Sequence, residues 1–329
     1  MTQDVSNPSG KLSPEALSRS VFASLGRVRP EVLVGPAVGE DAAVIRWPEG
    51  KLLVFAADPI VGAAKGAGRL LVRVNVNDIA SKGGEPAYIA VTLILPPDMG
   101  EGAVSHVMGE IHSECEKLGI AIVGGHTEFN GMYSHPVLSA ALIGMADRVY
   151  TASDIRPKDV IFVTGHIGIE GMAILASDRP DLLRGVLSRD ETAEVEGWMD
   201  QTSVLDASRL MRGYASFMHD PTEGGFLGGL HEICNLAGLS ADIDKAAVPL
   251  HEYTRRASEY LGFDPLRLVA SGSLMAVVRE DKADAAEGVF KKSGTAISRV
   301  GRMTDSARAA PSAPEYAEEL WGLLKRPDV

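Results

Sequence analysis

Short acidic motifs, each at the end of an apolar run, carry the residue types of this chain that could do chemistry. They are residues 39–43 (Gly-Glu-Asp-Ala-Ala), Ala57-Asp58, Asn77-Asp78, 124–128 (Gly-Gly-His-Thr-Glu) and 220–225 (Asp-Pro-Thr-Glu-Gly-Gly). Carboxylates are hard oxygen donors, and several of them in one cleft repel each other unless a divalent cation neutralises them. Mg²⁺ carrying nucleotide phosphates is the most frequent such cation, so the motifs favour a phosphate-handling enzyme.

The acids of the first half differ in how strongly their surroundings indicate a site. Asp41 lies in a glycine-flanked loop, and Asp58 directly follows a predicted buried strand at 52–56, a position where ligands gather in α/β proteins. Taken singly, either acid also fits a solvated turn or a helix cap. Asn77 and Asp78 lie within a helical pattern although neither is a good helix former, which favours a functional contact.

A glycine pair follows the next short predicted strand. Gly124 and Gly125 would let backbone N–H groups approach an anion, and Thr127 adds a hydroxyl. His126 or Glu128 could ligate a metal, while a structural hydrogen-bonding role for His126 is equally open.

Two glycine-rich segments of the second half each precede a predicted helix. Gly165, Gly168 and Gly171 follow a strand and resemble a phosphate-cradling loop at a helix N-terminus. Their spacing matches neither the dinucleotide-binding fingerprint nor the P-loop. In the segment 220–225, a helix cap is the default interpretation of the acid or the threonine taken alone.

Apolar patterning predicts the elements that must position these residues. Helices are expected at 14–25, 66–82, 101–118, 170–176, 203–214, 225–237, 251–261, 281–292 and 316–324, and strands at 52–56, 88–95, 120–123, 136–145, 160–163 and 274–278. Both halves mix strands and helices, which predicts an α/β (α+β) fold in two domains. We expect a flexible leader at 1–14, an N-terminal domain at 15–150, a C-terminal domain at 151–305, and a linker with a tail helix at 306–329.

The bulk composition narrows the class of protein. The 329 residues carry a formal net charge of -12 and no dense Lys/Arg run, which argues against nonspecific nucleic-acid binding. Cys115 and Cys234 lie far apart in helical patterns, which predicts buried thiols in a reducing compartment without disulfides or a thiolate zinc site. No signal peptide or membrane-spanning apolar run is visible, so we expect a cytoplasmic protein without a membrane partner.

Taken together, the motifs resemble those of one superfamily. It comprises aminoimidazole ribonucleotide (AIR) synthase, formylglycinamidine ribonucleotide synthase, selenophosphate synthetase, thiamine-monophosphate kinase and the hydrogenase maturation factor HypE. The second half resembles HypE most: 163–175 is similar to its glycine-rich segment, 220–225 to its Asp-Pro-Thr-Arg-Gly-Gly and 261–266 to its Leu-Gly-x-Asp-Pro-Leu.

The resemblance implies a two-domain AIR synthase-like fold and a homodimer formed through the N-terminal domain. It also implies ATP and Mg²⁺ in a cleft lined by the acids. By motif matching, the implied metal ligands are Asp41, Asp58 and Asp78, and Glu128 is a further candidate from its residue type. The candidate catalytic residues are Asp78, His126 and Asp220. The implied nucleotide contacts are Asn77, Gly124, Gly125, Thr127, Gly165, Gly168, Gly171, Thr222, Gly224 and Gly225.

The implied chemistry is phosphoryl transfer from ATP to an amide- or carbonyl-type oxygen of a small-molecule or protein-borne acceptor. Such catalysis consists mainly of positioning and charge neutralisation. HypE ends in a cysteine that accepts a carbamoyl group, whereas residues 324–329 contain none, so we expect no nitrile synthesis on a C-terminal thiol. HypE's Gly-Asp-Thr-Lys also becomes Gly-His-Thr-Glu at 125–128.

Two alternatives stay open. A thiamine-monophosphate-type kinase is one, because the motif at 39–43 suits it equally. A non-catalytic, ATP-binding maturation or assembly factor is the other, because of the departures from HypE.

Overall fold

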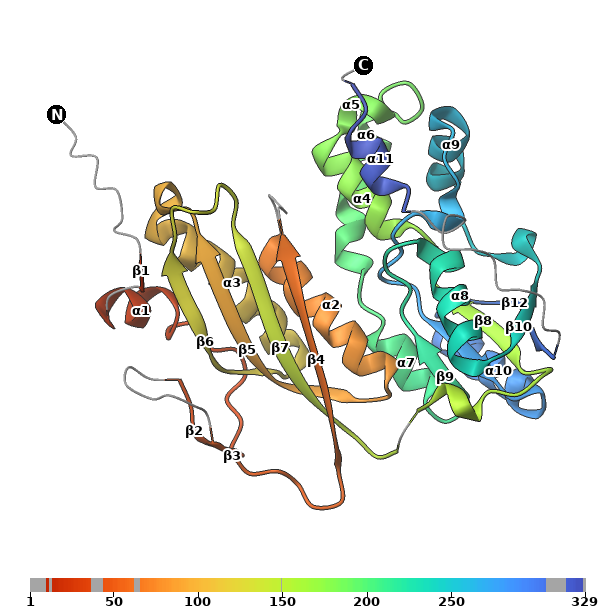
Figure 1. The fold of residues 1–329 in the computed structure, drawn as a ribbon, viewed down its shortest axis with the longest axis horizontal. Helices are drawn as coiled ribbons and strands as arrows, with labels where there is room; N and C mark the ends of the chain where they lie inside the picture. Colours follow the sequence, from red (N-terminus) through yellow and green to blue (C-terminus); the bar gives the residue numbers. More distant parts are fainter. Residues whose placement is uncertain are drawn as a thin grey trace. The chain divides into compact units, whose positions relative to one another are not determined.

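The chain divides into two compact units (Figure 1). The computed structural model describes residues 10–11, 14–36, 44–61, 66–148, 150–305 and 318–327. The N-terminal unit comprises Met1–Ile79 and Gly84–Asp147, and the C-terminal unit comprises Ala80–Gly83 and Arg148–Val329.

A five-stranded mixed sheet forms the centre of the N-terminal unit. Its strand order is β1-β6-β5-β7-β4; β5 and β6 run parallel, and the other neighbours are antiparallel. The strands are β1 (Gly10–Lys11), β4 (Leu52–Val61), β5 (Glu85–Leu95), β6 (Ala121–Phe129) and β7 (Val137–Ala146). β1 lies within the stretch expected to be a flexible leader, and it pairs there with the end of β6.

Two helices, α2 (Ala67–Ser81) and α3 (Gly100–Leu118), cover one face of this sheet, and both were predicted from their apolar stripes (Figure 1). Ile79 of α2 packs on Gly144 of β7, where a Cβ would overlap the isoleucine side chain. The even-numbered residues of β7 therefore face the helices, in agreement with their burial.

The opposite face is partly covered by a small two-stranded sheet of β2 (Val32–Val34) and β3 (Val44–Ile45), which packs against Tyr88 of β5. α1 spans Pro14–Ser20 and is shorter than the helix predicted at 14–25. The chain leaves α1 to form a bridge at Gly26, whose φ of 66° is not helical.

The edge strand β4 differs from the buried strand predicted at 52–56. It is the last strand in the sheet order and pairs with β7 along its whole length. Leu53 and Phe55 are 55% and 62% exposed, because they point to the face opposite α2. The strand continues to Val61, so Asp58 lies inside it rather than just past its end.

A five-stranded antiparallel sheet forms the centre of the C-terminal unit, in the order β10-β12-β8-β11-β9. The strands are β8 (Val160–Thr164), β9 (Ala215–His219), β10 (Ser240–Ile243), β11 (Met275–Val278) and β12 (Ile297–Thr304). The helices are α4 (Ile169–Asp178), α5 (Pro180–Leu183), α6 (Arg189–Glu196), α7 (Leu205–Met211), α8 (Gly225–Ala237), α9 (Glu252–Leu261), α10 (Ala283–Ser293) and α11 (Leu320–Leu324).

Three strands and two helices of this unit were missed by the sequence analysis: β9, β10, β12, α5 and α6. These elements are short or mix polar and apolar residues, so neither period stands out along them. A second apolar core surrounds α4, and α11 contributes Leu320 and Leu323 to it.

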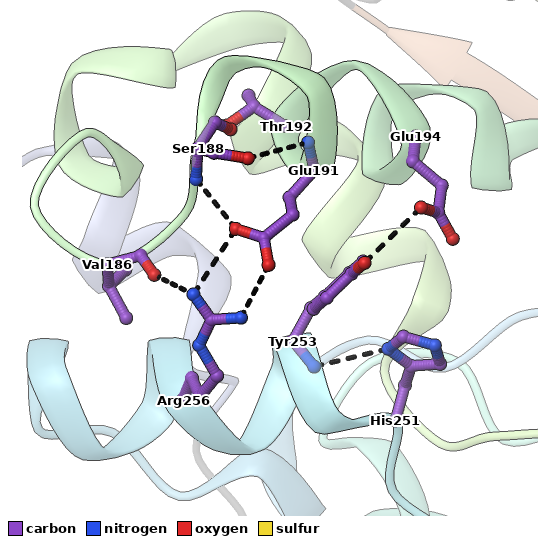
Figure 2. A network of polar contacts seen from close by, with 8 residues as sticks. All are labelled: Val186, Ser188, Glu191, Thr192, Glu194, His251, Tyr253 and Arg256. Atoms are coloured by element: carbon purple, nitrogen blue, oxygen red, sulfur yellow. Dashed lines mark hydrogen bonds and ion pairs between the residues drawn. The ribbon is translucent and has the colours of Figure 1, made fainter.

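A polar network joins α6 to α9 in the C-terminal unit (Figure 2). Ser188 and Glu191 form a capping box at the start of α6. Arg256 of α9 donates to both carboxylate oxygens of Glu191, at 2.6 and 3.2 Å. The hydrogen bond from Arg256 is the main cause that lowers the pKa of Glu191 to about 2. The network therefore fixes the two helices against each other.

Two further expectations concern thiols and membranes. Cys115 and Cys234 are free, buried thiols as predicted, and burial raises the pKa of Cys115 to about 12. Among the helices of the described residues, none combines the length and apolarity needed to cross a membrane.

Candidate functional site

Two of the acid motifs of the N-terminal unit lie on elements that contact each other, β4 and α2. Asn75 of α2 is fully buried, and its Oδ1 accepts the backbone N–H of Asp58 at 3.0 Å. Its Nδ2 donates to the carbonyl of Asp58 at 3.4 Å and to that of Leu71 at 2.9 Å. A buried side-chain amide thus holds the backbone of Asp58 against the helix that carries Asn77 and Asp78.

The two helix residues of this motif differ in exposure. Asn77 is fully buried, whereas the side chain of Asp78 is half-buried, as is that of Asp58. Both Asn77 and Asp78 make further polar interactions. A functional contact of Asn77 and Asp78 stays a prediction.

The predicted metal site remains a prediction, because Asp41 lies outside the described residues. Within the part of the chain that the structure describes, no three or more His, Cys, Asp or Glu side chains are placed to hold a metal ion. Asp58 and Asp78 supply the hard oxygen donors that suit Mg²⁺.

The motif at 124–128 lies inside strand β6. The sequence analysis had ended the strand before Gly124, which is wrong. Side chains alternate between the two faces of a strand. Leu93 of β5 pairs with Thr127 of β6 on one side and with Leu138 of β7 on the other, so the three side chains share one face of the sheet. Leu138 faces α2 and α3, and Thr127 is therefore buried on the face that these helices cover. His126 and Glu128 point to the opposite face.

His126 and Glu128 interact with each other on that opposite face. His126 Nε2 lies 3.1 Å from Glu128 Oε2, and the Nδ2 of Asn130 donates to Glu128 Oε1 at 3.1 Å. Asp58 pairs with Ala140 and so lies on the helix-covered face. The structure therefore does not bring Glu128 or His126 together with Asp58.

Gly125 is required by the packing of two parallel strands. Its φ is 147°, and a Cβ there would overlap the backbone carbonyl of Val91 on β5. Gly124 has no atom within 4 Å of where its Cβ would be. Close approach of β6 to β5 accounts for Gly125, while Gly124 has no such constraint.

In the C-terminal unit, two glycine-rich motifs found in the sequence converge on Leu268 and Val269. Added Cβ atoms at Gly168, Gly171 and Gly225 would each stand against Leu268, with that of Gly225 2.5 Å from its carbonyl oxygen. The N–H of Gly171 donates to the carbonyl of Val269 at 3.2 Å. These glycines let the loop before α4, the loop before α8 and the segment at 265–269 pack directly on one another.

No side chain of the N-cap residue caps helix α8; the N–H of that residue instead donates to a distant glutamate. Asp220 is buried at the end of β9, whereas Thr222 is exposed. The N-cap residue is Gly224, whose φ of 76° suits glycine, and no side chain of its own caps the helix. The N–H of Gly224 instead donates to Oε2 of Glu318 at 2.7 Å. The default interpretation of Asp220 or Thr222 as the cap is therefore wrong.

Glu170 was passed over by the sequence analysis. It is 6% exposed in the first turn of α4, and its Oε2 accepts the N–H of Ser271 at 3.2 Å. Burial raises the pKa of Glu170, and the nearby acids Glu318 and Glu223 contribute to the rise. Its place in a Gly-Ile-Glu-Gly run at a helix start was the available signal.

His166 follows Gly165 in the same loop and belongs to a cluster of rings. Its ring lies 5.5 Å from that of His251, which in turn lies 4.6 Å from those of Trp198 and Tyr253. His251 Nδ1 accepts the N–H of Tyr253 at the start of α9 (Figure 2). Burial, and then His251, lower the pKa of His166, which favours the neutral form of its ring. The loop is thereby tied to α9.

A mixed sheet backed by two helices, followed by an antiparallel sheet with glycine-rich loops, defines a two-domain α/β protein. The AIR synthase related protein models match it in order: the N-terminal domain at residues 39–146 and the C-terminal domain at 156–312. The chain belongs to the AIR synthase related family. The resemblance and fold class inferred from the sequence are confirmed.

Individual relatives support the same assignment. The carbamoyl dehydratase HypE of Rhizobium leguminosarum bv. viciae is 29% identical, over 75% of this chain and 71% of that protein. The one from Cupriavidus necator is 28% identical, over 82% and 78%. A crystal structure of HypE in complex with ATP has a TM-score of 0.73 at 22% identity, covering 91% of this chain and 88% of the other. Thiamine-monophosphate kinase from Stenotrophomonas maltophilia K279a reaches 0.70 at 21% identity, covering 84% and 90%.

Proposed function

We propose that this protein is an ATP- and Mg²⁺-dependent enzyme of the HypE type, which transfers phosphate to an amide- or carbonyl-type oxygen of its acceptor. The observation that carries the proposal is the hold of Asn75 on Asp58, which fixes this acid against the helix of Asn77 and Asp78. Relatives over most of the chain are carbamoyl dehydratases, which supports an ATP-dependent dehydratase.

Each group has a proposed task. Asp58 and Asp78 would hold Mg²⁺, with Asp41 as the third ligand, and the metal when bound would neutralise phosphate charge. Thr127 lies on the same covered face of the sheet as Asp58 and would donate its hydroxyl to a phosphate oxygen. His126 and Glu128 point to the other face and receive no metal role.

Isothermal titration with Mg·ATP tests the proposal. Asp58→Asn and Asp78→Asn should each weaken binding at least about tenfold, since each removes a charge from the metal ligands. Asp206→Asn, on an exposed position of α7, is the matched control and should bind like the wild type. No binding to the folded wild type at millimolar nucleotide would contradict the proposal.

An ADP-release assay separates the reactions. Turnover with carbamoyl- or amide-type acceptors is the expected result. Turnover with thiamine monophosphate alone would make the protein a kinase of that type. ATP binding without turnover on any acceptor would instead favour a non-catalytic maturation or assembly factor.

We also propose that the protein forms a homodimer through the sheet of the N-terminal unit. Leu53 and Phe55 are exposed on the edge strand β4, and Phe55 pairs with Ile143 on the same face. Exposed apolar side chains clustered on one face mark an interaction surface. Sedimentation analysis should show a dimer for the wild type and a monomer for Phe55→Glu; a monomeric wild type would contradict the proposal.

A further inference from the structure

Helix α2 carries Asp78 in its last turn, residues 78–81. Ile79 is the last residue of this helix in the N-terminal unit, and Ala80 and Ser81 belong to the C-terminal unit. The carbonyls of the last four residues of a helix have no N–H partner within the helix, so a last turn frays unless other groups hold it. Whatever holds the end of α2 therefore also fixes the backbone of Asp78.

A serine of α7 holds this end of α2. The hydroxyl of Ser208 donates to the carbonyl of Ala80 at 2.6 Å, and both residues are fully buried. The buried residues of α7 are Leu205, Ser208 and Met211, so the serine occupies a place on the buried stripe of the helix where apolar side chains are the rule. A buried hydroxyl is costly unless it is hydrogen-bonded, and here its bond goes to a terminal carbonyl of α2.

The two residues that follow α2 are held within the same unit. Gly83 has a φ of 70°, and its N–H donates to the carbonyl of Ala80 at 2.8 Å. A Cβ at Gly83 would lie 2.3 Å from the ring of Tyr150, which is itself buried. The Nζ of Lys82 lies 4.8 Å from the centroid of the ring of Phe217. Side chains of the C-terminal unit thus contact Ala80, Lys82 and Gly83, so the end of α2 is fixed by more than one contact.

We propose that Ser208 is a positioning residue for the metal site, whose hydrogen bond to Ala80 fixes the last turn of α2 and thereby the carboxylate of Asp78. Ser208 is fully buried, so it acts through the helix and not on a ligand. The metal role of Asp78 rests on the proposed function, whereas the hold on the last turn rests on the contacts alone. Because energetic coupling between two sites is reciprocal, Mg·ATP bound at Asp78 should in turn stabilise α7.

Two buried helical serines of the C-terminal unit allow a matched comparison. Ser208→Ala removes one of two donors to the carbonyl of Ala80, the other being the N–H of Gly83. Ser258→Ala is the same change in α9, where the hydroxyl donates to the carbonyl of Arg255 in its own helix. Each variant loses one hydroxyl hydrogen bond, but only Ser208→Ala loses a bond to α2.

Titration calorimetry with Mg·ATP is the first measurement. Ser208→Ala should bind about fivefold more weakly than the wild type, the effect of losing one net hydrogen bond. Ser258→Ala should match the wild type. Equal affinity in all three folded proteins would overturn the proposal, because a serine with a purely structural role changes the melting temperature and not the affinity of the folded protein. An equal loss in both variants would overturn it too, since that loss would not come from α2.

Hydrogen exchange is the second measurement and reads the end of α2 directly. The N–H groups of Gly83 and Gly84 donate to the carbonyls of Ala80 and Ile79 and so close the helix end. Without nucleotide, exchange in the peptide 79–84 should be faster in Ser208→Ala than in the wild type or in Ser258→Ala. In the wild type, Mg·ATP should slow exchange in the peptide 205–212, which contains α7.

The two measurements separate the role of Ser208 from the proposed function. If Mg·ATP binds and exchange at 79–84 is the same in all three proteins, the proposed function stands and the role of Ser208 is refuted. If exchange there rises in Ser208→Ala alone while no protein binds Mg·ATP, the hold of Ser208 on α2 stands and the proposed function fails. If Mg·ATP binds the wild type and leaves exchange at 205–212 unchanged, the coupling of α7 to the metal site is refuted.

Discussion

Asn75 holds both backbone polar groups of Asp58, accepting its N–H at 3.0 Å and donating to its carbonyl at 3.4 Å. A strand residue and a helix residue 17 positions apart are thereby joined by a reciprocal pair of hydrogen bonds. The side chain of Asn75 is fully buried, so water cannot replace these bonds if the amide is removed.

Replacing Asn75 by alanine should lower the free energy of unfolding by about 1–3 kcal/mol, because it leaves buried donors and acceptors without partners. It should also weaken Mg·ATP binding, because Asp58 is no longer fixed. Thermal unfolding and titration calorimetry measure the two effects. Asn235→Ala, on an exposed part of α8, is the control and should change neither. An Asn75 variant as stable as this control would refute the structural role.

Adding one methyl group to each of two adjacent glycines should have opposite results. Gly125→Ala should prevent close pairing of β5 with β6 and lower stability by several kcal/mol, roughly the effect of a severe backbone clash plus a strained φ. Gly124→Ala meets no atom within 4 Å and should be nearly neutral. Urea denaturation of both variants tests this, and equal midpoints would contradict the packing role of Gly125.

Removing one partner of the buried ion pair between α2 and α3 should be strongly destabilising. Arg73 Nε lies 2.7 Å from Glu114 Oε1, and both side chains are less than a tenth exposed. Arg73→Met should lower stability by about 3 kcal/mol, because it removes the buried cation of Glu114 and leaves only the more exposed Lys117, whose Nζ lies 3.4 Å from Glu114 Oε2. The double variant Arg73→Met with Glu114→Leu should recover part of that loss. Chemical denaturation measures the stability of both variants. A double variant less stable than Arg73→Met would show that the pair contributes nothing.

Glu170 makes the stability of the C-terminal unit depend on pH. Burial raises its pKa in the folded protein. A raised carboxyl pKa stabilises the fold at low pH, and this contribution is lost as pH rises through the folded pKa, when the buried group must ionise.

Glu170→Gln keeps an acceptor for the N–H of Ser271 and cannot ionise. Its melting temperature should therefore exceed that of the wild type by an amount that grows as the pH rises above the ordinary carboxyl pKa, by about 2–4 °C for each kcal/mol. Glu259→Gln, on the exposed face of α9, is the control. A difference that shrinks as pH rises would show that ionised Glu170 is instead stabilised.

Local patterns in the sequence were sufficient for several features of this protein. The spacing of apolar residues placed α2 and α3, because a helix needs a stripe of period 3.6 wherever it packs. Acid and glycine motifs with their spacing were sufficient for the family resemblance, which the family models confirm. Asn77 and Asp78 could be singled out from the sequence because residue type and position in a helical pattern are local properties.

Long-range contacts were needed for the remainder. Which face of the sheet receives Thr127 and which receives His126 depends on strand pairing, since shifting a strand by one residue exchanges its faces. The exposure of Phe55 follows from the edge position of β4, which no run of apolar residues reveals. The contact of Glu318 with Gly224 joins residues 94 positions apart, and only folding of the C-terminal unit brings that carboxylate to the start of α8.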